Sequence, residues 1–193
     1  MNSRHFVIYV PGLGDHQRHW HNLTLKFWQL FGVRVATYKI YWKDSRPFNQ
    51  KLDGLLARID ELHDQGYLVS LVGTSAGASA AINAYVRRMQ KVHRVVFICG
   101  KLQNIDVISP AYFRRNPSFE TSVKMVHSSI SILKRSDKAK MLSLQPLADG
   151  IVPPNDTKIA GVKNRRIFAV GHIFSIGVAE IFYAPSFLKF IKN

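Results

Sequence analysis

The segment Gly73-Thr74-Ser75-Ala76-Gly77 has the residue types and the spacing of an activated nucleophile. It follows the apolar run 68–72 and precedes the small-residue run 78–84, a pattern typical of a strand, a sharp turn and a helix. A serine at the apex of such a turn has a strained backbone and a raised hydroxyl, and positions 73 and 77 tolerate little beyond hydrogen. The pattern therefore predicts a nucleophilic hydroxyl at Ser75.

Two later residues supply the other groups that acyl transfer needs. Asp149 in Ala-Asp-Gly-Ile-Val-Pro and His172 in Val-Gly-His each follow a strand-like run. A histidine can accept the serine proton, and an aspartate can hold the imidazole tautomer and stabilise the imidazolium. Because groups that follow different parallel strands meet at one edge of a sheet, we expect Ser75, Asp149 and His172 to converge.

Each of these residues also has an ordinary structural interpretation. A Gly-x-Ser-x-Gly segment is often only a tight turn, and Asp149 lies in a stretch that is rich in turn residues. Asp156 and Asp137 are alternative acids for the same role. His172 could be a loop histidine, although no other histidine follows the last predicted strand.

With these positions the chain resembles the α/β-hydrolase superfamily, which is rich in serine esterases, lipases and thioesterases. The resemblance covers nearly the whole chain and rests on the serine turn, on Asp-Gly-Ile-Val-Pro, on Gly-His, and on Val-Pro-Gly-Leu-Gly-Asp after the first strand. It implies an oxyanion hole built from the backbone N–H groups of Ala76 and Leu13, with Gly12 as the alternative to Leu13.

Alternation of apolar, β-rich runs with helical patterns predicts a three-layer α/β fold with a mainly parallel sheet. We expect about six strands, near residues 6–10, 34–41, 68–72, 94–99, 141–145 and 165–170, and helices near 17–31, 51–65, 76–89, 119–133 and 176–191. Residues 1–193 are predicted to form one domain. The superfamily's usual sheet begins with two further strands, so this would be a minimal version of the fold.

Residues 101–138 occupy the position where the superfamily inserts substrate-covering elements, and we expect a small cap there. Five apolar residues recur at helical spacing, and this stripe either packs on the sheet or walls a pocket: Phe119, Val123, Val126, Ile130 and Leu133. The predicted acyl pocket consists of Tyr112, Phe113, Phe119 and Phe174. Arg115, or its neighbour Arg114, would favour a substrate that bears a carboxylate or phosphate.

Four residues near the oxyanion loop raise the possibility of a metal site: Asp15, His16, His19 and His21. Only His16 and His19 are helix neighbours, and Asp15 would cap a helix that begins near Gln17. We therefore expect no metal and no cofactor.

The net charge of +15 is the second notable feature of the composition. Many cations lie at strand beginnings or at the helix ends before them, so we expect a basic face opposite the serine that could contact anionic surfaces: Arg4, Arg34, Arg87, Arg88, Lys91, Arg94, Lys138, Lys140, Lys163, Arg165 and Arg166. No nucleic-acid motif accompanies these cations. The oligomeric state stays open.

The single cysteine, Cys99, excludes an internal disulfide. The first apolar run begins at Phe6, and no apolar run approaches the ~20 residues of a membrane helix, so a cytoplasmic location is expected.

These observations predict a serine hydrolase that cleaves a small or medium carboxylic ester or thioester, with a small-molecule acyl substrate as its partner. Two alternatives remain. One is a non-catalytic protein that binds a ligand or a partner on the same scaffold, and the other is an acyltransferase that uses the same three residues.

Overall fold

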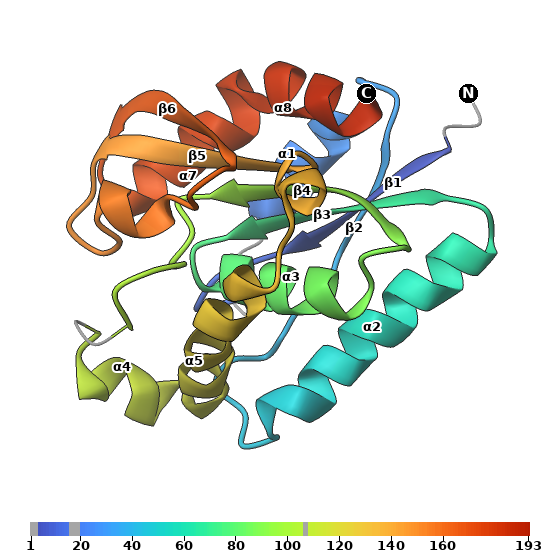
Figure 1. Cartoon of the computed structure of the whole chain (residues 1–193). Helices are drawn as coiled ribbons and strands as arrows, with labels where there is room; N and C mark the ends of the chain where they lie inside the picture. Colours follow the sequence, from blue (N-terminus) through green and yellow to red (C-terminus); the bar gives the residue numbers. More distant parts are fainter. Residues whose placement is uncertain (1–3, 16–19, 106–107) are drawn as a thin grey trace.

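A computed structural model describes residues 4–15, 20–105 and 108–193, and for residues 20–22 it describes the backbone only. Within these ranges, six strands form one parallel sheet in the order β2-β1-β3-β4-β5-β6 (Figure 1). The strands are β1 (His5–Val10), β2 (Arg34–Thr37), β3 (Leu68–Thr74), β4 (Val92–Ile98), β5 (Met141–Ala148) and β6 (Lys163–Val170). The predicted parallel α/β architecture is confirmed.

The order in which the chain adds strands to the sheet reverses direction at β1. This reversal marks the part of the sheet edge where a site is expected. The chain passes from β1 outward to β2, returns to β3 on the other side of β1, and then continues outward through β4, β5 and β6. The end of β1 lies beside the end of β3, with Val10 in register with Gly73. In open parallel sheets, ligands bind at the carboxyl ends of the strands at such a point.

Helices cover both faces of the sheet, as Figure 1 shows. On one face, α1, α7 and α8 contribute Trp28, Ile176 and Phe187 to a buried cluster with the sheet. On the other face, α2, α3 and α5 bury side chains such as Leu55, Tyr85 and Val126. Their bounds are α1 (Trp20–Gln29), α2 (Phe48–Asp64), α3 (Ala76–Arg87), α4 (Pro110–Arg115), α5 (Pro117–Ser131), α6 (Arg135–Lys138), the 3₁₀ helix η2 (Pro154–Thr157), α7 (His172–Phe182) and α8 (Ala184–Lys192).

The last predicted helix, near residues 176–191, is in fact two helices. The break falls at Tyr183, and the axes of α7 and α8 differ by 60°. Pro185 lies in the first turn of α8, where its missing N–H is tolerated, whereas in the middle of a continuous helix the ring would clash with the preceding turn. The sequence prediction of one helix is wrong for this reason.

The predicted cap segment divides into a core part and a peripheral part. Val123 and Val126 on α5 are fully buried against the α2 and α3 side of the sheet, so the apolar stripe packs into the core. Ser122 and Ser129 on the same helix hydrogen bond to Ser79 and Asn83 of α3. The short helix α4 has no buried residue, so it is the part of this segment that stands outside the core.

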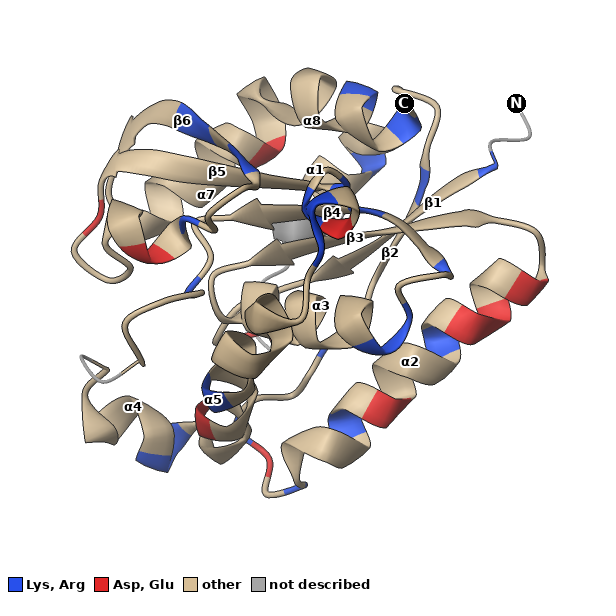
Figure 2. Ribbon diagram, viewed as in Figure 1, with Lys and Arg blue, Asp and Glu red and all other residues tan. Residues whose placement is uncertain are grey.

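Charge is distributed unevenly over the helices. Figure 2 shows acidic residues along α2 beside basic residues, and some of the cations of the predicted basic face are paired there. Arg88 and Lys91 lie 2.8 and 3.0 Å from Asp60, and the hydrogen bonds from Arg88 are the main reason why the pKa of Asp60 falls to about 2. Contact of the basic face with an anionic partner stays a prediction.

In the part of the chain that the structure describes, no single helix is both long and apolar enough to cross a membrane. Only α7 and α8 taken together reach the required length and composition, and that pair is sharply bent.

Candidate active site

Ser75 lies in the tight connection between β3 and α3. Its backbone has φ 53° and ψ −121°, a region that a non-glycine residue rarely occupies. A Cβ at Gly77 would overlap the carbonyl oxygen of Val10, and a Cβ at Gly73 would lie 2.6 Å from the carbonyl oxygen of Gly77. The two glycines therefore let the turn pack against the end of β1, as the sequence pattern predicts.

His172 connects Ser75 to Asp149. The Nε2 atom of His172 lies 2.8 Å from Ser75 Oγ, and its Nδ1 atom lies 2.6 Å from Asp149 Oδ2. A carboxylate can only accept a hydrogen bond, so Nδ1 carries the proton and Nε2 is left to accept the proton of the serine hydroxyl. The three residues come from the ends of β3, β5 and β6, and the fold brings them together as expected.

The loop after β5 holds Asp149 as a carboxylate. Burial pushes the pKa of Asp149 upward, but the hydrogen bond with His172 and the backbone N–H groups of Val152 and Ile151 outweigh burial, so the pKa lies below its ordinary value. These backbone groups donate to Asp149 Oδ1 at 3.0 and 2.8 Å, which leaves Oδ2 for the imidazole. The turn chemistry of this loop therefore supports the interaction with His172.

The two alternative acids have other partners. Asp156 forms a buried ion pair with Lys101 at 2.5 Å. Asp137 accepts a hydrogen bond from the N–H of Lys134 at 3.0 Å, at the start of α6, and another from the Tyr85 hydroxyl. Asp149 is the carboxylate that contacts His172.

The expected oxyanion donors lie around Ser75. Leu13 and Ala76 line the same cavity as Ser75, and Ala76 is the first residue of α3, where a backbone N–H has no partner within the helix. Gly12 is so close that a Cβ there would lie 2.7 Å from Ser75 Cβ and 3.2 Å from Ser75 Oγ. The two residues expected to supply the N–H groups, Leu13 after β1 and Ala76 at the start of α3, therefore line the cavity that contains Ser75.

The cavity at Ser75 has a volume of about 390 Å³ and a mostly apolar lining. Phe119 and Tyr112, both predicted pocket residues, line it together with Ile108, Ile151 and Val152. Much of the wall thus comes from the loop after β5, and Lys101, Ile108 and Ser109 add to it beside the two cap-segment helices.

Other residues predicted for the pocket are not part of the lining. Phe113 packs behind Phe119, with 5.9 Å between the ring centroids. Phe174 is 67% exposed, because it lies on the outward stripe of α7. Arg114 and Arg115 are exposed on α4 and also lie outside the lining. Phe113, Phe174 and Arg115 are therefore corrections to the predicted pocket, because spacing along the chain did not tell which way the side chains point.

One charged residue that the sequence analysis did not single out lines this cavity. Lys101 comes two residues after Cys99, directly beyond the end of β4, and it is 3% exposed. A charged residue just past the carboxyl end of a buried parallel strand is a signal that could have been used, since that edge of the sheet is where sites form.

The predicted metal cluster lies mainly outside the described residues. This applies to His16 and His19, and the side chain of His21 is likewise not described. Asp15 accepts a hydrogen bond from the N–H of Tyr41 at 2.6 Å. Within the described ranges no group of three or more His, Cys, Asp or Glu side chains could hold a metal ion.

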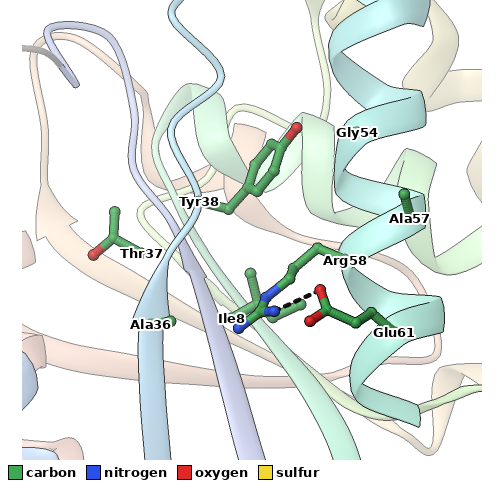
Figure 3. Close-up of a pocket in the computed structure, with 8 residues that line it drawn as sticks. All are labelled: Ile8, Ala36, Thr37, Tyr38, Gly54, Ala57, Arg58 and Glu61. Carbon is green, nitrogen blue, oxygen red and sulfur yellow. Dashed lines mark hydrogen bonds and ion pairs between the residues drawn. The ribbon is translucent and has the colours of Figure 1, made fainter. Parts of the chain in front are cut away.

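A separate cavity of about 330 Å³ lies between β2 and α2 (Figure 3). Its two charged residues, Arg58 and Glu61, form an ion pair with each other at 2.6 Å, and apolar or small residues such as Ile8, Ala36 and Gly54 make up much of the remaining wall. No residue of this wall is a candidate nucleophile next to a base, in contrast to the arrangement at Ser75.

No family model and no curated protein matches the chain. Solved structures do match over nearly the full length. A structure of the metagenome-derived lipolytic enzymes LipS and LipT has a TM-score of 0.73 at 14% identity, with 98% of this chain and 94% of that chain covered.

Two further structures give the same result. The ydeN gene product from B. subtilis has a TM-score of 0.69 at 13% identity, with coverage of 98% and 100%. Est1E from Butyrivibrio proteoclasticus has a TM-score of 0.65 at 12% identity, with coverage of 100% and 90%. At such identities the likeness concerns the fold, and the chain has the α/β-hydrolase fold.

Proposed function

We propose that this chain, which has the α/β-hydrolase fold, is a serine hydrolase that cleaves a carboxylic ester or thioester through an acyl-enzyme on Ser75. The observation that carries the proposal is the continuous hydrogen-bonded chain from Asp149 through His172 to Ser75, with distances of 2.6 and 2.8 Å. The similarity in fold to lipolytic enzymes and esterases supports the same reaction class.

In the acylation step, Ser75 Oγ attacks the carbonyl carbon of the substrate while His172 Nε2 takes the hydroxyl proton. Asp149 keeps the imidazole in the tautomer that can accept this proton and stabilises the imidazolium that forms. The negative oxygen of the tetrahedral intermediate receives hydrogen bonds from the N–H groups of Ala76 and Leu13. Collapse of the intermediate breaks the bond to the leaving group, which takes the proton from His172.

In the deacylation step, His172 takes a proton from water as the water oxygen attacks the acyl carbon. The bond between Ser75 Oγ and the acyl carbon then breaks, and Ser75 recovers its proton from His172. No cofactor takes part in either step.

The cavity supports a substrate of limited size. About 390 Å³ is near the lower end of the range for small-molecule sites, and its lining is largely apolar. We therefore propose a small or medium acyl group rather than a long chain.

Labelling with a fluorophosphonate tests the proposal without knowledge of the substrate. We expect mass spectrometry to locate one phosphonyl adduct on Ser75 of the purified protein. The adduct should disappear in Ser75→Ala, which lacks the nucleophile, and fall to background in His172→Ala, which lacks the base.

An esterase assay with neutral p-nitrophenyl acetate, butyrate and octanoate reports the chain-length preference of the same preparation. If the folded protein neither reacts with the fluorophosphonate nor hydrolyses any of these esters, the hydrolase proposal is wrong, and a ligand-binding role on the same scaffold takes its place.

A further inference from the structure

Lys101 is the one charged side chain among the described residues that line the Ser75 cavity. Its side chain is 4% exposed, and its backbone N–H donates to the carbonyl oxygen of Ser75 at 3.2 Å. The main chain of Lys101 is therefore tied to the serine turn itself, and Lys101 is a residue of the cavity wall.

A pair of side chains holds Lys101 in place. Asp156 Oδ2 accepts a hydrogen bond from Lys101 Nζ, and Asp156 Oδ1 accepts one from Asn104 Nδ2, each at 2.5 Å. Asn104 has φ 50°, a conformation that Asn tolerates better than most residues and that a folded protein keeps only where its surroundings impose it. Both carboxylate oxygens of Asp156 are therefore occupied.

The same residues join two loops that border the site. The backbone N–H of Leu102 donates to the carbonyl oxygen of Asp156 at 3.0 Å, and the N–H of Asp156 donates to Pro153 at 2.8 Å. The loop after β4 is thus fastened to the loop after β5, which carries Asp149. This arrangement fixes the position of the ammonium relative to Ser75.

The ammonium of Lys101 has hydrogen-bonding capacity to spare. It carries three N–H donors, and within the described part of the chain Asp156 Oδ2 is its one acceptor. A buried charge is costly to leave with unused donors, and a buried ion pair often stabilises a protein no more than apolar residues of the same volume would. Lys101 lines a mostly apolar cavity and keeps two donors that no described residue uses, and these donors are available to an anionic group of a ligand.

The geometry points to Lys101 as a specificity-determining residue that binds a carboxylate carried by the ester substrate, with Asp156 and Asn104 as the residues that position it. This inference rests on the proposed hydrolase activity and names the substrate class of the same site. It also moves the predicted preference for an anionic substrate from Arg115 on the exposed helix α4 to a buried lysine in the cavity wall.

The test compares pairs of esters that differ in one terminal carboxylate. We measure kcat/KM for p-nitrophenyl hydrogen glutarate, which has a carboxylate on the acyl side, against p-nitrophenyl butyrate. The butyrate ester of 4-hydroxybenzoic acid places the carboxylate on the alcohol side instead, and the butyrate ester of 4-hydroxybenzamide is its neutral comparison. We expect the wild type to prefer one of the two charged esters over its neutral comparison by about 10- to 100-fold, the value of one or two charge-assisted hydrogen bonds.

Variants then assign the preference to Lys101. Lys101→Met should lower the charged-to-neutral ratio to about one, and Lys101→Arg should retain most of it. Because Lys101→Met leaves Asp156 as an unpaired buried charge and could unfold the protein, the double variant Lys101→Met, Asp156→Asn removes both charges together. Lys51→Met is the matched control, since Lys51 is equally buried but does not line this cavity, and it should leave the ratio unchanged.

A second readout does not need turnover. Free glutarate should slow fluorophosphonate labelling of Ser75 in the wild type, whereas its neutral diamide at the same ionic strength should not, and Lys101→Met should abolish the protection. Hydrolysis of the neutral ester without a charge preference, and labelling that glutarate does not slow, would overturn the role of Lys101 while leaving the hydrolase proposal intact. A preference that persists in Lys101→Met and disappears in Arg115→Ala would return the anion site to α4.

Discussion

Two lysines of this protein are buried to the same degree, and they differ in what surrounds the ammonium. Lys51, on α2, has a side chain that is 2% exposed, and Lys101, beyond β4, has one that is 4% exposed. Lys51 Nζ donates to the carbonyl oxygens of Tyr41 and Asp44 at 2.7 and 3.2 Å and to Ser118 Oγ at 2.6 Å. Lys101 Nζ has a single acceptor within the described residues.

This difference separates a structural lysine from a functional one. The donors of Lys51 are used to connect α2, the turn at residues 41–44 and the start of α5, so its burial is explained by the fold. The donors of Lys101 are only partly used, and Lys101 is a residue of the wall of the Ser75 cavity. The presence of unused hydrogen-bond donors on a buried lysine, and not its burial, is therefore the property that indicates a binding role.

Among the substitutions considered, the largest loss of activity is expected at the nucleophile. Ser75→Ala should lower kcat for ester hydrolysis by about 10⁵- to 10⁶-fold, because no other group can form the acyl-enzyme. Its midpoint of urea unfolding should stay close to that of the wild type, since the Ser75 hydroxyl holds no other part of the fold together. Residual activity within tenfold of the wild type would show that the reaction does not pass through Ser75.

The next largest effect is expected for Asp149→Asn. An amide at this position can donate to His172 Nδ1, which would place the imidazole proton on Nε2 and prevent it from accepting the serine proton. A fall in kcat of about 10⁴-fold is expected by steady-state assay. The variant Asp156→Asn is the control, because its partner is Lys101 and not His172, and a comparable fall in neutral-ester turnover there would contradict the assignment of the acid.

Lys51→Met should act on stability and leave the selectivity of the site unchanged. The substitution removes the donor shared by Tyr41, Asp44 and Ser118 and leaves their acceptors without it, at a cost of about 1–3 kcal/mol. Lys51 Nζ also contacts the carboxylate of Asp44 at 2.8 Å, but Asp44 is 37% exposed, so no fully buried charge is stranded. Urea unfolding measures the change in the free energy of unfolding. If Lys51→Met is stable but its kcat/KM ratio for charged over neutral esters is altered, the two lysines do not have the distinct roles proposed for them.

A smaller effect is expected on the pH dependence of stability. Because the pKa of Asp149 is lowered in the folded protein, its contribution to the free energy of unfolding is present above the ordinary carboxyl pKa of about 4 and is lost as the pH falls through the lower folded value. Urea midpoints should thus fall more steeply below about pH 4 in the wild type than in Asp149→Asn. Identical slopes would show that this carboxylate is not stabilised by folding.

A feature of the fold was predictable from the sequence when its signal comes from residues that are close together in the chain. The serine turn depends on Gly73, Ser75 and Gly77, which are neighbours in the chain, and the structure has the predicted turn. The six strands were predictable because strands of a buried parallel sheet contain short, nearly continuous apolar runs, whereas helices show apolar residues at helical spacing. The helix break at Tyr183 was missed because the apolar pattern continues through Pro185, although the proline itself marks the start of a new helix.

The pocket residues were harder to predict because a lining residue is defined by side-chain direction. Phe113 and Phe119 are close in the sequence, yet Phe119 lines the cavity and Phe113 lies behind it. Phe174 follows His172 by two residues, but on α7 that step turns it outward.

The sequence by itself determined the layered parallel fold, the turn at Ser75 and the order of the three residues that meet there, because these depend on hydrophobic period, on glycine positions and on strand ends. Only the tertiary structure decided which acid contacts His172 and which lysine keeps free donors. Asp149 and Asp156 lie seven residues apart in one loop, and Lys51 and Lys101 are the same residue type at equally buried positions. Their roles differ because residues distant in the chain, brought next to them by folding, set the hydrogen bonds that each one makes.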